Sequence, residues 1–136
     1  MWKKHCYFGY SDMEYETVFW VDDERDPFSE EWKPVATNKK FIHSAEPMIV
    51  WLKSYDEFTS FVDIATFNGG NLWFPTLVCF DHDLGGEKSG LDCAKYLVNV
   101  CMEYNLELPH YTCHSSNPAG RENILSYLDS YIKSLQ

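Results

Sequence analysis

The sequence predicts an α/β fold with three layers, in which helices cover a mostly parallel β-sheet. Two observations support this fold class. Short apolar runs alternate along the chain with segments whose apolar residues recur at helical spacing. Each run stops abruptly at polar side chains, as a strand does when it leaves a sheet that is covered on both faces. Because connections of this kind cross over with right-handed geometry, the strands are expected to be parallel.

Four apolar runs are the expected strands. They are Thr17–Val21, Met48–Leu52, Thr76–Phe80 and Tyr111–His114. The third run begins irregularly because Pro75 cannot donate a backbone hydrogen bond to a sheet. With the first strand central and the second on its outer side, the expected strand order is 2-1-3-4. The carboxyl ends of the first and third strands then border the switch point, where open α/β folds bind their ligands.

The expected helices begin at recognisable capping residues. Ser54 opens a Ser-x-x-Glu capping box, and Ser89 opens a similar Ser-x-x-Asp sequence. Asn117 is a natural N-cap, and the proline that follows it suits the first position of a helix. The Asn-Gly-Gly-Asn sequence at residues 68–71 is expected to close the first of these helices, and the second is expected to run to about Tyr104.

The chain of 136 residues has the usual length of a single domain. Two segments fall outside the regular alternation of strands and helices. Residues 1–16 form an N-terminal extension rich in aromatic residues, which is expected to cover a sheet edge or to bind a protein partner. Residues 26–47 contain three prolines and several charges, which indicates a long loop insertion with a short strand near Phe41–Ile42.

Composition limits the classes of function. The chain is 45% hydrophobic but has no apolar run long enough to span a bilayer, so no membrane association is expected. Residues 1–6 lack the apolar stretch of a secretory signal, which favours a cytoplasmic protein. A net charge of −10 disfavours binding to duplex DNA. The five cysteines include no C-x-x-C pair, so they are expected to be buried and reduced.

Polar side chains gather just past three of the expected strands. They are Asp22, Asp23, Asp81, His82, Asp83 and His114. Because the carboxyl ends of parallel strands share one edge of the sheet, we expect these side chains to meet there. Crowded carboxylates repel one another unless a cation compensates them. Asp22, Asp23 and Asp81 are therefore the expected ligands of a divalent metal, with Asp83 in support. Magnesium or manganese suits such ligands best, although the imidazoles leave iron, nickel and zinc open.

The remaining residues at this edge suit phosphate chemistry. His82 and His114 could divide the roles of general base and general acid, because imidazole titrates near neutral pH. Arg25 offers two parallel donors to a phosphate group. Ser115, Ser116 and Asn117 precede a helix whose first backbone amides attract anions. Arg25 and these three residues are the expected substrate ligands.

Each of these residues also has a structural interpretation. Asp22 and Asp23 could form a solvated turn, because carboxylates commonly end strands. His114 alone is more often a hydrogen-bonded structural residue. Arg25 could pair with acidic residues on the surface, and Asn117 could serve only as a helix cap. A functional site is favoured because three separate strand ends carry reactive side chains on the same expected edge.

Three linked motifs resemble those of the cyclic-phosphate-processing receiver-like family. They are Trp20-Val21-Asp22-Asp23-Glu24-Arg25, Asp81-His82-Asp83-Leu84-Gly85-Gly86 and His114-Ser115-Ser116-Asn117-Pro118-Ala119-Gly120. Their order and spacing match over residues 17–25 and 48–136. The resemblance implies the flavodoxin-like fold of response-regulator receivers, whose acidic residues hold magnesium. The last strand of an ordinary receiver, with its phosphoryl-binding lysine, has no counterpart in this sequence.

The family resemblance implies a phosphodiesterase-type activity on a cyclic phosphate, either a cyclic nucleotide or a 2′,3′-cyclic phosphate end of RNA. The leading hypothesis is a metal-dependent hydrolase that uses the residues named above. The alternative is a receiver-like module without catalysis that binds a protein or a nucleotide. Phosphoacceptance at Asp81 ranks lowest, because the lysine is missing. A role in conflict between phage and bacteria also fits, by resemblance alone.

Overall fold

The computed structural model describes residues 16–67 and 73–136. Within these ranges the strands are β1 (Thr17–Val21), β2 (Met48–Leu52), β3 (Leu77–Phe80) and β4 (His110–Cys113). They form one parallel sheet in the order β2-β1-β3-β4, which confirms the predicted fold class and strand order. The predicted bounds of β1 and β2 are confirmed. Strand β3 begins one residue later than predicted, and β4 lies one residue earlier, so that His114 follows the strand.

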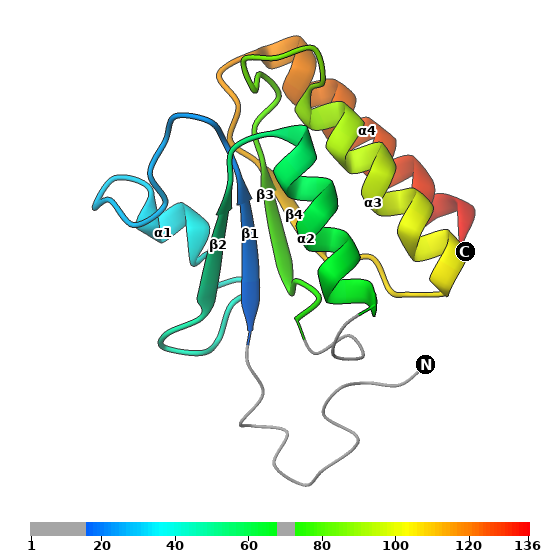
Figure 1. Ribbon diagram of the computed structural model, residues 1–136, viewed down its shortest axis with the longest axis horizontal. Helices are drawn as coiled ribbons and strands as arrows, with labels where there is room; N and C mark the ends of the chain where they lie inside the picture. Colours follow the sequence, from blue (N-terminus) through cyan, green and yellow to red (C-terminus); the bar gives the residue numbers. More distant parts are fainter. Residues whose placement is uncertain (1–15, 68–72) are drawn as a thin grey trace, which may run out of the picture.

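The register of the sheet brings the strand ends together. All strands run upward in Figure 1, so their carboxyl ends share the upper edge. Val21 lies beside Phe80, and Phe80 lies beside Cys113. The ladder continues one residue further, because the amide of Asp81 donates to the carbonyl of Val21 (2.9 Å) and the amide of His114 donates to that of Phe80 (3.0 Å). The sheet itself therefore fixes the backbone of both residues.

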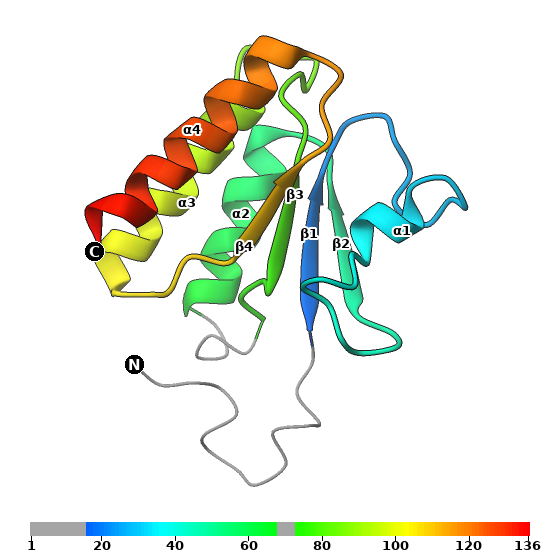
Figure 2. The same ribbon diagram turned by 180° about the vertical axis from the view of Figure 1, so that it is seen from behind.

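Three long helices cover one face of the sheet. They are α2 (Tyr55–Phe67), α3 (Gly90–Tyr104) and α4 (Pro118–Ser134). Figures 1 and 2 show all three on the same side, with α2 packed beside α3 and with α3 and α4 side by side. Helix α3 ends at Tyr104 as predicted, whereas the segment 68–71, expected to close α2, lies outside the described residues.

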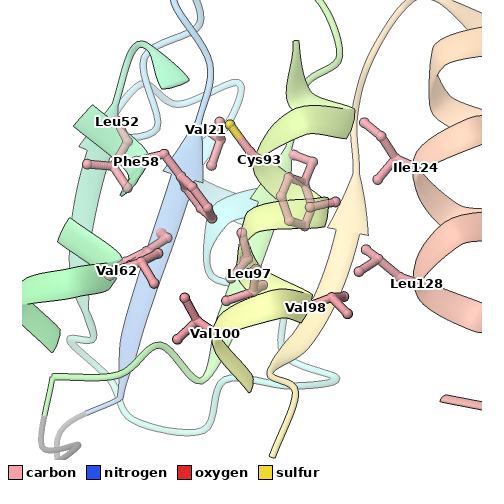
Figure 3. Packing of buried hydrophobic residues seen from close by; sticks show 14 of the residues in the cluster. Val21, Leu52, Phe58, Val62, Cys93, Leu97, Val98, Val100, Ile124 and Leu128 are labelled. Atoms are coloured by element: carbon pink, nitrogen blue, oxygen red, sulfur yellow. The ribbon is translucent and has the colours of Figure 1, made fainter. Parts of the chain in front are cut away.

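The main core lies between this face and the helices. Figure 3 shows Phe58 and Val62 of α2, Leu97 of α3, and Ile124 and Leu128 of α4 pointing into it. These side chains are fully buried and recur at helical spacing within each helix. Burial of each contributes about 1.5–3 kcal/mol relative to exposure. The apolar stripes that predicted the helices are therefore the surfaces that hold them on the sheet.

The predicted helix starts at Ser54 and Ser89 are confirmed, but only the second forms the complete capping box. The amide of Glu57 donates to Oγ of Ser54 (3.1 Å), although the Glu57 carboxylate accepts from the amide of Lys53 rather than from Ser54 itself (2.8 Å). The carboxylate of Asp92 accepts from the amide of Ser89 (2.8 Å), which completes the second capping box. Such local bonds satisfy helix amides that have no partner inside the helix, so they can be recognised from sequence alone.

The opposite face of the sheet is covered by residues 26–47. This insertion contains the four-residue helix α1 (Lys33–Ala36), and Ala36 and Ile42 pack against Trp20 of β1. The prediction of a short strand near Phe41–Ile42 was wrong. The amide of Ile42 donates to the carbonyl of Asn38 (2.8 Å) in a turn, and the Ile42 side chain is buried under the sheet rather than paired at its edge.

Of residues 1–16, only Glu16 belongs to the described part of the chain. Cys79, Cys93, Cys101 and Cys113 are buried free thiols, as expected, and Cys6 lies outside the described residues. In residues 16–67 and 73–136, no helix has the length and apolar character needed to cross a membrane.

Candidate active site

The candidate site lies at the carboxyl edge of the sheet. Asp22 follows β1, Asp81 follows β3, and His114 follows β4, so three adjacent strands each place one of these side chains there. Asp22 is fully buried and Asp81 nearly so. Asp23, the next residue after Asp22, is partly exposed. The structure thus brings together the three carboxylates that the sequence predicted would meet.

Asp22 is the centre of the hydrogen-bond network. Its Oδ1 accepts the amides of Glu24 (2.8 Å) and Arg25 (3.0 Å), and its Oδ2 accepts Nη1 of Arg25 (3.1 Å) and Nε2 of His114 (2.8 Å). A carboxylate has about four lone-pair positions, so these bonds occupy them all. Burial alone would raise the pKa of Asp22, but the bonds from His114, Arg25 and Glu24 lower it to about 2. Asp22 is therefore ionised.

Asp81 has the opposite electrostatic balance. Burial and then the negative charge of Asp22 raise its pKa, while a hydrogen bond from Ser115 and the charge of Arg25 partly offset the rise. Its Oδ1 accepts the amide of His82 (3.0 Å). The site therefore favours an ionised Asp22 beside an Asp81 that holds its proton more strongly than an ordinary aspartate.

The three carboxylates could hold one divalent cation. Oxygens of Asp22, Asp23 and Asp81 all lie within 4.8 Å of one another. Nη1 of Arg25 lies 3.1 Å from Asp22 and 3.5 Å from Asp81. With all three carboxylates ionised, one guanidinium leaves two negative charges uncompensated, which equals the charge of one Mg²⁺ or Mn²⁺. Because Asp22 is already saturated with hydrogen bonds, we expect Asp23 and Asp81 to supply the direct ligands.

His82 and Asp83 form a polar pair at the rim of the site. Nδ1 of His82 lies 3.0 Å from Oδ1 of Asp83. Asn117 donates its Nδ2 to the other oxygen of Asp83 (3.4 Å), and its Oδ1 accepts the amide of Gly120 (3.0 Å) as the N-cap of α4. The hydrogen bond from His82 and then that from Asn117 lower the pKa of Asp83. An ionised Asp83 holds the proton of His82 on Nδ1, which leaves Nε2 as the atom that can accept another.

His114 occupies a different environment. Its ring stacks on Trp20, with centroids 4.0 Å apart and planes 6° apart, and its side chain is only 5% exposed. Nε2 donates to the ionised Asp22, and Nδ1 is buried without a hydrogen-bond partner in the described structure. Both nitrogens are thus shielded from water. This arrangement suits a residue that positions Asp22 better than one that exchanges protons with a substrate.

The expected phosphate ligands differ in their positions. Arg25 bridges Asp22 and Asp81 and lies over the ring of Trp32, with its Cζ 5.3 Å from the centroid. Ser115 accepts the amide of Asn117 (3.1 Å) besides bonding to Asp81. Ser116 is exposed on the loop between β4 and α4. Phosphate binding by Arg25, Ser115, Ser116 and Asn117 stays a prediction.

A comparison with protein-family models matched residues 17–130 to the cyclic-phosphate processing receiver domain. The chain belongs to this family. Searches of curated proteins and of solved structures found no match. The match confirms the resemblance inferred from the three motifs, and it also spans residues 26–47, which that resemblance had left out.

Several residues that shape this receiver domain were missed by the sequence analysis. Trp20 and Trp32 both pack on the ring of His114, and Nε1 of Trp51 donates to the carbonyl of Asp22 (2.7 Å). Gly85 has a φ of 77° beside Asp23, a conformation that favours glycine. Trp20 and Trp51 lie in apolar runs, where tryptophan indicates only a core position, and Trp32 lies among charged residues of the loop insertion, so no local signal distinguishes these residues. For Gly85, the glycine in the Asp81-His82-Asp83-Leu84-Gly85 motif could itself have indicated a backbone with positive φ.

Gly120 should control the position of His82. A Cβ atom at residue 120 would overlap Cγ of the His82 ring, so Gly120→Ala is expected to displace that ring. Alanine gains about 1 kcal/mol of helix propensity over glycine, but forced overpacking costs roughly 1–3 kcal/mol, so the overlap should dominate. The imidazole resonances of His82 in proton NMR should shift, whereas those of the control Ala119→Gly should not. Unchanged His82 resonances in Gly120→Ala would contradict this packing.

Metal binding should depend on pH through Asp81. Its pKa is raised, and a carboxyl group must lose its proton to bind a metal. The affinity for Mn²⁺ is therefore expected to increase as pH rises above about 4, the ordinary range of an aspartate, and to level off once Asp81 is ionised. Calorimetric titrations in buffers of different ionisation enthalpy should detect the released proton. A pH-independent affinity with no proton release would show that Asp81 is not a ligand.

Proposed function

We propose that this receiver domain is a metal-dependent phosphodiesterase that hydrolyses a cyclic phosphate. The observation that carries the proposal is the position of the cluster Asp22, Asp23 and Asp81 on the same sheet edge as the pair His82–Asp83. A carboxylate cluster suits a divalent cation, and an oriented imidazole suits proton transfer. Membership of the cyclic-phosphate processing family supports the class of substrate.

The carboxylates and Arg25 have distinct roles in this proposal. Asp23 and Asp81 hold the divalent cation, and Asp22 fixes the loop that carries Asp23. When bound, such a cation would polarise a phosphoryl oxygen and lower the pKa of a coordinated water. Arg25 leaves its ion pairs with Asp22 and Asp81 and donates two parallel hydrogen bonds to the phosphate group of the substrate. Its side chain is 25% exposed, which leaves it room to turn toward a ligand.

His82 transfers the proton that the attacking water loses during hydrolysis. Nε2 of His82 takes a proton from the attacking water as the new phosphorus–oxygen bond forms. The same nitrogen returns the proton to the ring oxygen that leaves when the cyclic phosphodiester opens, so that a monoester and a free hydroxyl result. Asp83 holds Nδ1–H of His82 throughout, and Asn117 orients Asp83. Of the two histidines predicted as catalytic, we assign proton transfer to His82.

His114 is a positioning residue in this proposal. Its Nε2 holds Oδ2 of Asp22, and its ring is buried against Trp20. A proton acceptor has to reach the reacting water, either directly or through one further water. The His114 side chain is only 5% exposed, so its contribution is to hold Asp22 in position.

The direct test is hydrolysis of a panel of cyclic phosphates. Purified protein, freed of metal with a chelator, should be incubated with 3′,5′-cyclic nucleotides, cyclic dinucleotides and RNA with 2′,3′-cyclic ends. Turnover of at least one substrate is expected only after Mg²⁺ or Mn²⁺ is restored. If no substrate is turned over, but one of them binds with a dissociation constant that calorimetry can measure, the domain is a binding module. Labelling of Asp81 by acetyl phosphate would instead indicate phosphoacceptance.

A further inference from the structure

An apolar groove lies at the end of the sheet opposite the candidate active site. It has a volume of about 190 Å³ and lies between α2 and the first halves of β1 and β2. Thr17 and Val50 form part of its floor, and Phe61, Ile64 and Trp73 form part of its walls. Thr17 and Met48 begin their strands, so these two lining residues lie at the lower edge of the sheet in Figure 1.

Large apolar side chains around the groove are exposed to solvent. Phe61, Ile64 and Trp73 are between 41% and 48% exposed, and Phe67, one turn further along α2 than Ile64, is 57% exposed. Single exposed apolar residues are common on soluble proteins, but a contiguous group around a hollow marks an interaction surface. Such a surface requires a specific occupant.

The described structure begins at Glu16, one residue before the groove lining. The carbonyl of Glu16 accepts the amide of Met48 (2.9 Å), and Oε1 of Glu16 accepts the amides of His43 (2.8 Å) and Ser44 (2.5 Å). Thr17, the next residue, lines the groove. Three hydrogen bonds therefore fix Glu16, the residue that joins residues 1–15 to the groove lining at Thr17.

The composition of residues 1–15 matches the groove. The segment contains five aromatic residues and two methionines: Trp2, Tyr7, Phe8, Tyr10, Tyr15, Met1 and Met13. Its two lysines and two acidic residues cancel in charge. Fifteen residues can extend about 50 Å, far more than the groove requires. A tether this short also gives the segment an effective concentration near the millimolar range.

We propose that residues 1–15 fold back over this groove and bury its exposed apolar walls with their aromatic side chains. A second copy of the chain is the competing occupant. It is disfavoured because each chain carries a net charge of −10, so that two copies repel each other, whereas the tethered segment is close to neutral. The groove is thereby a docking site for the chain's own aromatic arm.

Disulfide trapping with the native Cys6 tests the proposal. The other four cysteines are buried, so Cys6 is the available partner for a thiol introduced in the groove by Ile64→Cys. The matched control is Phe28→Cys, which replaces an exposed apolar residue past the opposite end of β1. With diamide as oxidant, an intramolecular disulfide should form many-fold faster in Ile64→Cys than in the control. Equal rates, or a disulfide between two chains, would overturn the proposal.

Removal of the segment gives an independent readout. A variant that lacks residues 2–14 should bind the dye ANS several-fold more strongly than the full chain. Adding Ile64→Asp to the shortened chain should abolish most of that increase, because the dye would then meet a charged wall. If the shortened chain does not fold, Phe8→Ser with Tyr10→Ser in the full chain serves the same purpose. ANS fluorescence equal to that of the full chain in a folded variant would contradict a docked arm.

Discussion

His82→Gln is expected to reduce metal-dependent turnover by about 10²–10⁴-fold, the usual contribution of a general acid–base residue. Glutamine fills a similar volume and can still donate to Asp83, but it cannot accept and return a proton at neutral pH. Because His82 does not contact the oxygens of the cluster through its side chain, metal affinity should stay unchanged. Steady-state kinetics and a calorimetric Mn²⁺ titration on the same preparation measure both quantities.

His114→Gln is the matched comparison for that variant. Glutamine can still donate an amide hydrogen to the buried, ionised Asp22, but it loses the ring that stacks on Trp20 and holds the donor in place. The expected result is weaker metal binding and a lower free energy of unfolding, with turnover restored in part by excess metal. The proposal would fail if His114→Gln lost turnover at saturating metal while His82→Gln retained it, because the two histidines would then have exchanged roles.

Gly90→Ala is expected to destabilise the fold by about 3 kcal/mol or more, at the upper end of the cost of overpacking. A Cβ atom at residue 90 would overlap the backbone carbonyl oxygen of Asp81, and the amide of Gly90 donates to the carbonyl of His82 (2.8 Å). Neither partner is a flexible side chain, so the clash can be relieved only by moving α3 away from the loop that carries the site. Urea unfolding followed by tryptophan fluorescence measures the loss.

Gly86→Ala is the control for Gly90→Ala. A Cβ atom at residue 86 would meet nothing within 4 Å, and the residue lies in the same β3–α3 connection. Its free energy of unfolding should stay constant or rise by roughly 0.4–1 kcal/mol, because alanine reduces the entropy of the unfolded chain. Equal stability of the two variants would show that α3 does not pack on the Asp81 backbone as described.

The features that could be predicted from sequence are those with local causes. Strand β1 is buried on both faces and reads as a continuous apolar run at residues 17–21. The edge strand β2 is only partly buried but is also a continuous apolar run, so its bounds followed directly from residues 48–52. The cap at Ser54 and the capping box at Ser89 are bonds between residues three apart, so they too were visible in the sequence. The gathering of Asp22, Asp23 and Asp81 followed from the strand order.

Features that depend on distant contacts could not be predicted. Helix α1 has only four residues, too few for a helical period, and Ala36 is buried because it packs under the sheet. The role of His114 depends on Asp22, 92 residues earlier in the chain, and on the ring of Trp20. A histidine past a strand looks the same in sequence whether it faces water or a buried carboxylate. The different environments of His82 and His114 become visible only in the folded structure.

Metal binding at the carboxylate cluster is tested most directly by a calorimetric titration of the metal-free protein with Mn²⁺, repeated on Asp81→Asn. Asparagine keeps the size of the side chain but removes its negative charge and one carboxylate oxygen. We expect the unmodified chain to bind one Mn²⁺ and Asp81→Asn, still folded, to bind it at least tenfold more weakly, a loss of about 1.4 kcal/mol or more. No binding by the unmodified chain, or equal binding by both proteins, would contradict a metal site in which Asp23 and Asp81 supply the direct ligands beside Asp22.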